Sequence, residues 1–194
     1  MALLSSSPFS SILIILCIFS SIFLTLVTAK VDGGYAQSFD PEELGMKKEK
    51  FSHFRFYWHD IVSGSNPTSV TVVHPPSNSS TFGQINMIDN PLTEGPNLTS
   101  KLIGKAQGFY GSASQEGIGL IMVMNFAFME GKYNGSTITV LGRNMIFTKI
   151  REMAVIGGTG VLRFARGYAQ ASTYYANFTT RDAIVEYNCY VVHY

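Results

Sequence analysis

The sequence predicts an all-β fold, either a barrel or a sandwich. Beyond Phe51, short runs rich in β-branched and aromatic residues alternate with clusters of turn residues, which is typical of such folds. No stretch keeps a helical period over several turns. The expected strands are 51–60, 70–73, 82–88, 105–110, 120–129, 137–141, 146–156, 161–173 and 183–194.

Length and charge narrow the class of protein. The 194 residues suffice for one domain with a core, and hydrophobic residues make up 46% of them. Only 14% are charged, the net charge is +1, and the basic run is the short segment 46–50. Proteins that bind nucleic acid need a basic surface, so this composition argues against that function.

The first 29 residues carry no charged side chain and are almost continuously apolar from Ile12 to Val27. Small residues end this run at Ala29, which predicts a secretory signal peptide (1–29) cleaved near that residue. A membrane anchor is the alternative, because the run is close to the shortest length that spans a bilayer. The polar segment 30–50 is expected to be a flexible N-terminal arm, and 51–194 the folded domain.

Secretion would give meaning to four Asn-X-Ser/Thr sequons. A single sequon often arises by chance, but four in one secreted chain predict glycosylation and a surface position for the segments that carry them. The acceptor residues are Asn78, Asn97, Asn134 and Asn177.

The run 51–60 is the strand from which a chemical role can be argued. Alternation places Phe54, Phe56, Trp58 and Asp60 on one face, which should look inward. A carboxyl buried at the end of an aromatic face has a raised pKa, which suits a general acid working near neutral pH. The alternative is that Asp60 caps the turn after the strand.

The run 120–129 is apolar on both faces apart from Asn125. A barrel strand in a monomer buries only one face, and the sequence offers no helix to cover the other. We therefore expect this strand at an interface between subunits. The Asn125 amide would need hydrogen-bond partners if it were buried there.

Arg151 shares one face of the predicted strand 146–156 with Phe147, Lys149, Met153 and Val155. An inward arginine needs an anionic partner or a ligand oxygen, whereas an outward one would lie on the exterior. The sequence leaves both orientations open. If Arg151 points inward, Asp60 is a candidate partner, and the cation would then oppose the rise that burial causes in the Asp60 pKa.

Three further features have structural interpretations. The segment 157–160 (GGTG) lacks a following helix and a Gly-Lys-Ser/Thr ending, so it predicts a hairpin turn and not a phosphate-binding loop. Cys189 would be the only thiol once signal cleavage removes Cys17, and we expect it to be buried and structural. The histidines form no ligand spacing, so no metal or cofactor is expected; they are His53, His59, His74 and His193.

Several segments resemble the plant dirigent family in sequence, order and spacing. They are 56–61 (FYWHDI), 104–110 (GKAQGFY), 157–160 (GGTG) and 164–169 (FARGYA), and the resemblance covers about 51–194. Three more segments are similar to the pterocarpan synthases of legumes, a branch of that family. These are 86–93 (NMIDNPLT), 134–144 (NGSTITVLGRN) and 186–194 (EYNCYVVHY).

The resemblance implies an eight-stranded antiparallel β-barrel of the dirigent and allene-oxide-cyclase type. It also implies a homotrimer, secretion to the plant apoplast and a phenolic ligand in the barrel mouth. Coupling-type dirigent proteins carry an acidic pair; its first member matches Asp60, and Asn144 stands at the second position. Tyr110 and Arg151 match positions that line the pocket. The expected substrate-binding residues are Phe56, Trp58 and Asn144.

Two function classes follow. The first is an enzyme, a hydro-lyase of isoflavonoid phytoalexin biosynthesis in plant defence, which dehydrates a 2′-hydroxyisoflavan-4-ol to a pterocarpan through a quinone methide. Asp60 would be the general acid, while Tyr110 and Arg151 would orient or stabilise phenolic oxygens. The second is a non-catalytic template that directs the coupling of phenoxy radicals made by a separate oxidase. Asn144 in place of the second acid favours the first.

Overall fold

The computed structural model describes residues 38–46 and 48–194. The chain divides into two compact units, 1–44 and 45–194. In the described part of the first unit, residues 41–44 lie in a turn, and the Glu42 backbone N–H donates to the Asp40 carboxylate. The predicted signal peptide and most of the predicted arm lie outside the described residues. No helix among the described residues has the length and hydropathy needed to cross a membrane.

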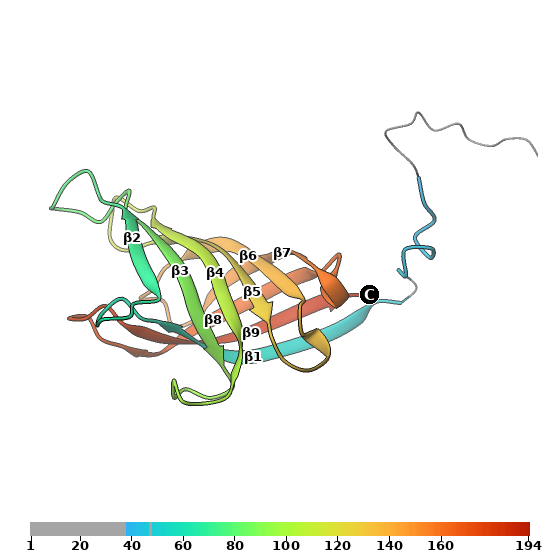
Figure 1. Cartoon of the computed structure of the whole chain (residues 1–194). Coiled ribbons are helices and arrows are strands. Elements are labelled where there is room, and N and C mark those ends of the chain that lie inside the picture. The colour runs from blue at the N-terminus through green and yellow to red at the C-terminus, as the bar shows by residue number, and fades with distance from the viewer. Residues whose placement is uncertain (1–37, 47) are drawn as a thin grey trace, which may run out of the picture. The chain divides into compact units, whose positions relative to one another are not determined.

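The described part of the second unit consists of nine strands and two short 3-10 helices (Figure 1). Glycine, proline and asparagine residues mark many of the turns between the strands, and β-branched and aromatic residues favour extended structure within them. The strands are β1 (Lys50–Asp60), β2 (Ser69–Val73), β3 (Ile85–Thr93), β4 (Leu102–Ser112), β5 (Leu120–Phe128), β6 (Thr137–Asn144), β7 (Arg151–Gly158), β8 (Arg166–Ala176) and β9 (Ala183–His193). The helices are η1 (Gly131–Tyr133) and η2 (Gly160–Leu162).

The strands close into a barrel. Their order is β1-β9-β8-β7-β6-β5-β4-β3-β2, every neighbouring pair is antiparallel, and β1 also pairs with β3. The ring therefore has eight positions, because β1 and β2 share the same edge of β3: Trp58 lies opposite Leu92, and Ser69 lies opposite Ile88. The prediction of an eight-stranded antiparallel β-barrel is confirmed.

The shared edge explains why β3 ends later than the sequence predicted. The turn-like residues Asn90 and Pro91 suggested a loop from residue 90 to 100, yet β3 continues to Thr93. Proline cannot donate to a strand ladder. The Asp89 N–H donates to the Thr68 carbonyl, so the nitrogen of Pro91, two residues on, faces the same edge at the junction between β2 and β1. No ladder donor is needed there.

Several other strand boundaries differ from expectation, and the largest differences are at the starts of β7 and β8. Residues 146–150 form a turn rather than a strand, so β7 begins at Arg151, and β8 runs from Arg166 instead of starting near residue 161. Phe147 and Lys149 consequently lie on an exposed turn and share no strand face with Arg151. The segment 157–160 does connect two strands, as expected of a hairpin and not of a phosphate loop, but the connection includes η2.

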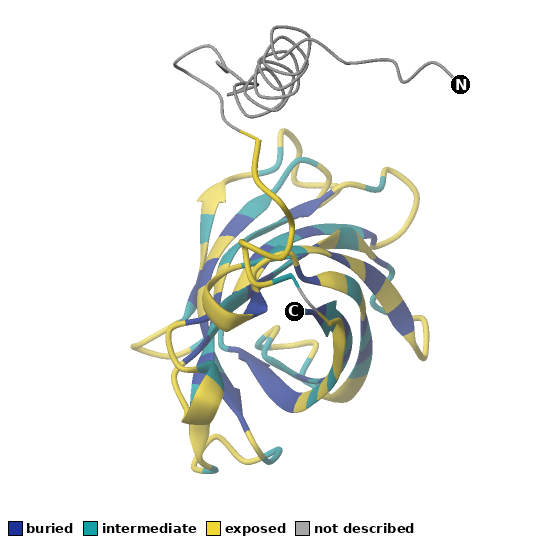
Figure 2. Ribbon diagram, turned by 90° about the vertical axis from the view of Figure 1, so that its right-hand side faces the viewer, coloured by how far each residue is buried: buried dark blue, intermediate teal, exposed yellow. Residues whose placement is uncertain are grey.

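The barrel interior is the hydrophobic core (Figure 2). Alternate residues of each strand point inward, as in β5, where the buried side chains are Met122, Met124, Phe126 and Phe128. Aromatic rings pack across the interior: the ring centroids of Phe56 and Phe126 are 4.9 Å apart, and those of Phe126 and Tyr187 are 5.1 Å apart. Burying each such ring contributes about 1.5–3 kcal/mol.

The outward face of β5 is only partly covered in a single chain. Ile121, Val123 and Ala127 are half-buried. Asn125, the polar residue in this strand, is exposed in the single chain. Its side-chain oxygen accepts a hydrogen bond from Thr139 at 2.7 Å. The subunit interface at this strand stays a prediction.

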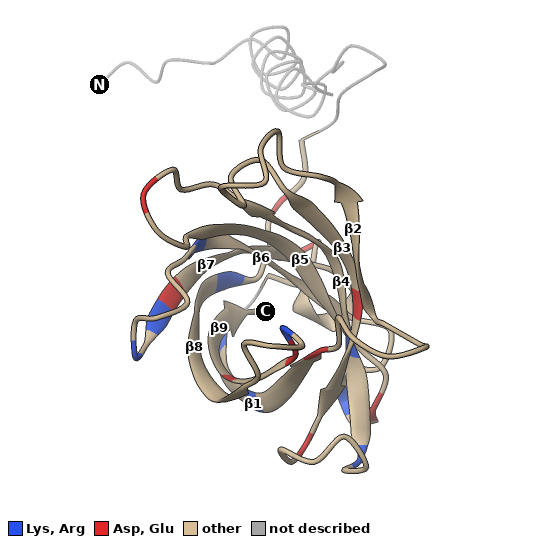
Figure 3. Cartoon of the chain, turned by 90° about the vertical axis from the view of Figure 1, so that its left-hand side faces the viewer, with Lys and Arg blue, Asp and Glu red and all other residues tan. Residues whose placement is uncertain are grey.

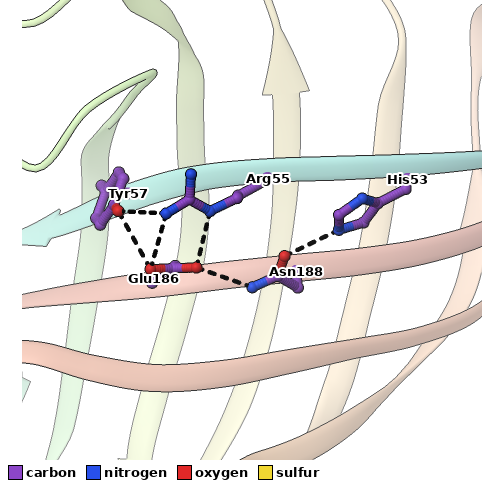
Figure 4. A network of polar contacts seen from close by, with 5 residues as sticks. All are labelled: His53, Arg55, Tyr57, Glu186 and Asn188. Carbon is purple, nitrogen blue, oxygen red and sulfur yellow. Dashed lines mark hydrogen bonds and ion pairs between the residues drawn. The ribbon is translucent and has the colours of Figure 1, made fainter.

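Polar groups connect β1 and β9 on the outside of the barrel (Figure 4). Arg55 donates to Glu186 at 2.9 and 3.2 Å, and Tyr57 donates to the same carboxylate at 3.1 Å. His53 and Asn188 extend this network along the strands. Acidic and basic residues are interspersed over the described part of the chain (Figure 3), and some of them form ion pairs, such as Lys105 with Asp89 and Lys101 with Glu130.

Candidate functional site

Asp60 lies at the end of β1 on the inward face, beyond Trp58, and only 7% of its surface is exposed. The pairing register places it at the end of the barrel where β1, β4 and β6 finish and where β5, β7 and β9 begin. We call this the Asp60 end. The strand alternation predicted from the sequence is therefore observed, and the carboxyl faces the interior instead of capping the turn.

Three strands supply the surroundings of the Asp60 carboxyl. The Asn90 amide of β3 donates to one oxygen at 3.1 Å, and the Tyr110 hydroxyl of β4 donates to the other at 3.0 Å. Ser69, at the start of β2, lies 3.0 Å from the Tyr110 hydroxyl. Thr68 donates to the Asn90 carbonyl oxygen at 2.6 Å, which fixes the amide with its NH₂ group toward Asp60.

Burial dominates the acidity of this site. It raises the Asp60 pKa to about 6, although hydrogen bonds from Asn90, Tyr110 and Ser69 oppose the shift. Burial also raises the pKa of Tyr110 above its usual range, and the nearby Asp60 adds to that effect. Asp60 thus exchanges a proton near neutral pH, while Tyr110 stays a neutral donor.

Arg151 points into the barrel from the first position of β7 and is 5% exposed. Its Nε donates to the Asn144 carbonyl oxygen at 3.0 Å, and Nη1 donates to the Thr148 carbonyl at 3.4 Å. Asn144 is buried at the end of β6 and directs its NH₂ group at the Met122 sulfur, 3.5 Å away. Burial lowers the pKa of Arg151, because these neutral partners compensate its charge only in part.

Arg151 points inward, but the candidate pairing with Asp60 is not formed among the described residues. Arg151 bonds to Asn144 and Thr148, and the charges that act on Asp60 do not include it. The physical reason is the position of their strands. Arg151 lies on β7, opposite Ala171 of β8, whereas Asp60 lies on β1, opposite Ala183 of β9. Strands β8 and β9 separate β7 from β1, so the two side chains face each other across the interior. The Asp60 pKa is accordingly set by burial and not by a neighbouring cation.

Aromatic residues lie between these two polar groups. Phe56 is fully buried, and Trp58 is 4% exposed next to Asp60 on the inward face of β1. Tyr187 of β9 packs against both, with ring centroids 6.0 and 6.3 Å away. Phe56 packs against other aromatic rings of the core, namely Phe126, Phe128 and Tyr187. Its role in substrate binding stays a prediction.

The structure adds residues that the sequence did not single out. Asn90 and Ser69 lie outside the strands predicted from the sequence and had no predicted role. They acquire one only because β2 and β3 meet β1 at the barrel seam. Tyr187 was predicted to lie in a strand but was given no role. Its signal was available, since alternation along 183–193 puts Tyr187 on the same face as the buried Cys189 and Val191.

The remaining chemical groups of the sequence lie outside this site. Cys189 is fully buried, as expected, and burial raises its pKa, which makes a reactive thiolate unfavourable. His59 faces away from Asp60 on β1 and bonds to Thr93 at 2.6 Å. Among residues 38–46 and 48–194, no three His, Cys, Asp or Glu side chains gather in a metal-binding arrangement.

Comparison with known proteins identifies the family. The model of the dirigent-like proteins matches residues 51–192. The chain belongs to the dirigent-like family. This dirigent-like chain is 51% identical to dirigent protein 7 of Arabidopsis thaliana over 183 residues, which cover 93% of this chain and 98% of the relative. It is 52% identical to pterocarpan synthase 1 of Glycyrrhiza echinata over 177 residues, which cover 89% and 92% of the two chains.

Solved structures agree with this assignment. The dirigent-like barrel is similar to the pterocarpan synthase dirigent protein GePTS1, with a TM-score of 0.76 and 54% sequence identity. The match covers 82% of this chain and 99% of that one. The pterocarpan synthase dirigent protein PsPTS1 gives a TM-score of 0.72 at the same identity and covers 75% and 96% of the two chains.

Proposed function

We propose that this protein is a carbon–oxygen lyase that dehydrates a 2′-hydroxyisoflavan-4-ol and closes the pterocarpan ring. The observation that carries the proposal is Asp60, a buried carboxyl with a pKa of about 6 held by neutral donors. A group with this pKa is present in both protonation states near neutral pH, as an acid that is later used as a base must be. The similarity to two proteins named pterocarpan synthase supports the substrate class.

The reaction needs one proton donor and one electron-rich phenol. Protonated Asp60 gives its proton to the C4 hydroxyl, which leaves as water, while the 7-hydroxyl releases its proton to solvent water and its electrons enter the ring. The product is a neutral quinone methide. The 2′-hydroxyl then attacks C4 and returns a proton to the Asp60 carboxylate, while the 7-oxygen regains a proton from solvent water as the ring becomes aromatic again. Tyr110 holds the Asp60 carboxyl in place throughout.

The arrangement of Arg151 and Asn144 is consistent with this polar but non-redox chemistry. Arg151 is a buried cation whose bonded partners are neutral, so it can stabilise negative charge that builds on a phenolic oxygen. An acid at residue 144 would bind Arg151 as an ion pair and take away part of this capacity. Asn144 leaves the positive charge of Arg151 for the substrate.

Purified protein incubated with a 2′-hydroxyisoflavan-4-ol and no oxidant tests the function. We expect loss of water and formation of the pterocarpan, measured by chiral chromatography and mass spectrometry. Product formed only when an oxidase is added, from phenol precursors that couple through radicals, would instead assign the protein to the template class. A variant with Asp89→Asn, a change on the barrel exterior, serves as the control for protein quality.

We also propose that the protein assembles as a homotrimer through the outward face of β5. Half-buried Val123 lies between Phe109 on β4 and Leu141 on β6, and Leu141 and Met87 on β3 are 38% and 45% exposed in the single chain. Burying this row would remove apolar surface from water. Sedimentation of the deglycosylated protein at micromolar concentration should show a trimer, and Val123→Lys should dissociate it. A wild-type monomer would refute the assembly.

Secretion to the apoplast and glycosylation complete the proposal. The charge-free segment 1–29 supports the first, and the four sequons support the second. Asn78, Asn97 and Asn134 are exposed, whereas Asn177 is half-buried and its side-chain oxygen accepts bonds from two backbone N–H groups. Mass spectrometry of plant-expressed protein should find a mature N-terminus near Lys30 and glycan on at least one sequon. Intact Met1 without sugar would contradict both expectations.

A further inference from the structure

Two buried side-chain atoms have no hydrogen-bond partner among the described residues, and both lie at this site. They are the Trp58 indole nitrogen and the Tyr187 hydroxyl. A buried donor that loses water and gains no partner destabilises the fold. A phenylalanine at residue 187 would fill the same space in the core without that penalty. The hydroxyl is therefore available to donate to an acceptor that the described side chains do not supply.

The surroundings of Tyr187 indicate what that acceptor is. On the inward face, Tyr187 lies opposite Ala171 on β8, which in turn lies opposite Arg151 on β7. The small Ala171 side chain leaves the phenol and the guanidinium without a large neighbour between them. Burial raises the pKa of Tyr187, nearby Arg151 opposes the rise and Asp60 adds to it, so the hydroxyl stays protonated and feels both charged groups.

Arg151 has donors left for the same acceptor. Its Nε and Nη1 bond to Asn144 and Thr148, and Nη2 has no partner within the described part of the chain. An oxygen bound between Nη2 and the Tyr187 hydroxyl would receive two hydrogen bonds, one of them from a charged group. In the proposed reaction, the leaving 4-hydroxyl and the attacking 2′-hydroxyl both exchange protons with Asp60 and so lie beside that carboxyl. The remaining oxygen that takes part is the 7-oxygen, which becomes a carbonyl and then a hydroxyl again.

Resting on the proposed function, we propose that the Tyr187 hydroxyl binds the 7-oxygen of the substrate and stabilises it as the quinone methide forms. Tyr187 donates a hydrogen bond and transfers no proton, so the proton balance of the reaction is unchanged. Asp60 and Tyr187 then act on opposite ends of the same conjugated system. This arrangement selects substrates that carry a free 7-oxygen.

Tyr187→Phe tests the assignment with a change that removes one oxygen atom. We expect kcat on the isoflavanol to fall on the order of 10²-fold, as for other donors to a reacting oxygen, while the melting temperature stays the same or rises. Tyr133→Phe is the matched control. The Tyr133 hydroxyl bonds to Ser52 at 3.0 Å, beside His193 at the end of β9 and thus at the opposite end of the barrel, so this variant should lose stability and keep its activity.

A binding measurement separates this inference from the proposed reaction. Trp58 is the only tryptophan of the chain, so its fluorescence reports on ligands at the site. The probes are a 2′,7-dihydroxyisoflavan, which lacks the 4-hydroxyl and cannot react, and its 7-deoxy analogue. Wild type should prefer the 7-hydroxy probe about tenfold, and Tyr187→Phe should lose the preference.

The outcomes are distinct. A preference that is lost in Tyr187→Phe supports the assignment even if wild type shows no dehydratase activity, in which case the proposed reaction fails and the binding site stands. An unchanged preference in Tyr187→Phe, or no binding of the 7-hydroxy probe to wild type, would overturn the assignment of Tyr187.

Discussion

Asp60→Asn is expected to lower turnover of the isoflavanol by about 10²–10⁴-fold, the usual range for loss of a general acid. The amide keeps the shape of the carboxyl and its hydrogen bonds, because its oxygen can accept from Asn90 and its NH₂ group can donate to Tyr110. Only the transferable proton is lost. In wild type, kcat/KM should fall as pH rises through about 6, since the acid form is then lost.

The same variant should be more stable than wild type at neutral pH. The unperturbed pKa is 3.8 and the folded value is about 6, so the folded state holds a proton that the unfolded state has released between these pH values. Wild-type stability therefore falls across this window, by about 2–3 kcal/mol in total. Asparagine does not titrate, so the advantage of Asp60→Asn should be full at pH 7 and absent below pH 4.

Urea unfolding at pH 4, 5, 6 and 7, together with pH–rate profiles, tests both expectations. Asp89→Asn is the matched control, because Asp89 faces outward and pairs with Lys105, which lowers its pKa. That variant should keep its activity and gain no stability at pH 7. Near-wild-type turnover by folded Asp60→Asn would rule out Asp60 as the acid and make Tyr110 the leading candidate.

Arg151→Met is expected to lower kcat by about 10²–10³-fold, as removal of a group that stabilises charge in the transition state does. Methionine fills much of the same buried volume. The free energy of unfolding should change little. Removing a buried charge that is only partly compensated stabilises the fold, and leaving the Asn144 oxygen without a donor destabilises it. The pH at which kcat/KM declines should stay near 6, because Arg151 does not set the acidity of Asp60.

The pH at which kcat/KM declines shows whether Arg151 acts on the acidity of Asp60. If Arg151 stabilised the Asp60 carboxylate, its removal would raise the Asp60 pKa and move the decline to higher pH. Such a shift would contradict the separation of the two groups across the barrel. Arg55→Met is the control: Arg55 binds Glu186 on the barrel exterior, so its loss should leave the rate and its pH dependence unaltered.

Local patterns determined much of this protein. Alternation along 51–60 was enough to place Trp58 and Asp60 on the inward face, because a strand has a fixed period of two. The resemblance in motif order predicted the eight-stranded barrel, and it also identified Tyr110 and Asn144 as candidate site residues. Strand interiors were predicted better than strand ends, since Pro91 and the turn 146–150 carry ambiguous signals.

Only the tertiary structure decided which of these residues act together. Asp60 and Asn90 are 30 residues apart and meet because β1 and β3 close the barrel, and Arg151 bonds to Asn144 rather than Asp60 because its strand lies across the interior. The acidity of Asp60 follows from that closure, since burial is a property of the whole barrel. A sequence fixes the face on which a side chain lies, but distances across a barrel depend on register and closure, which no single strand encodes.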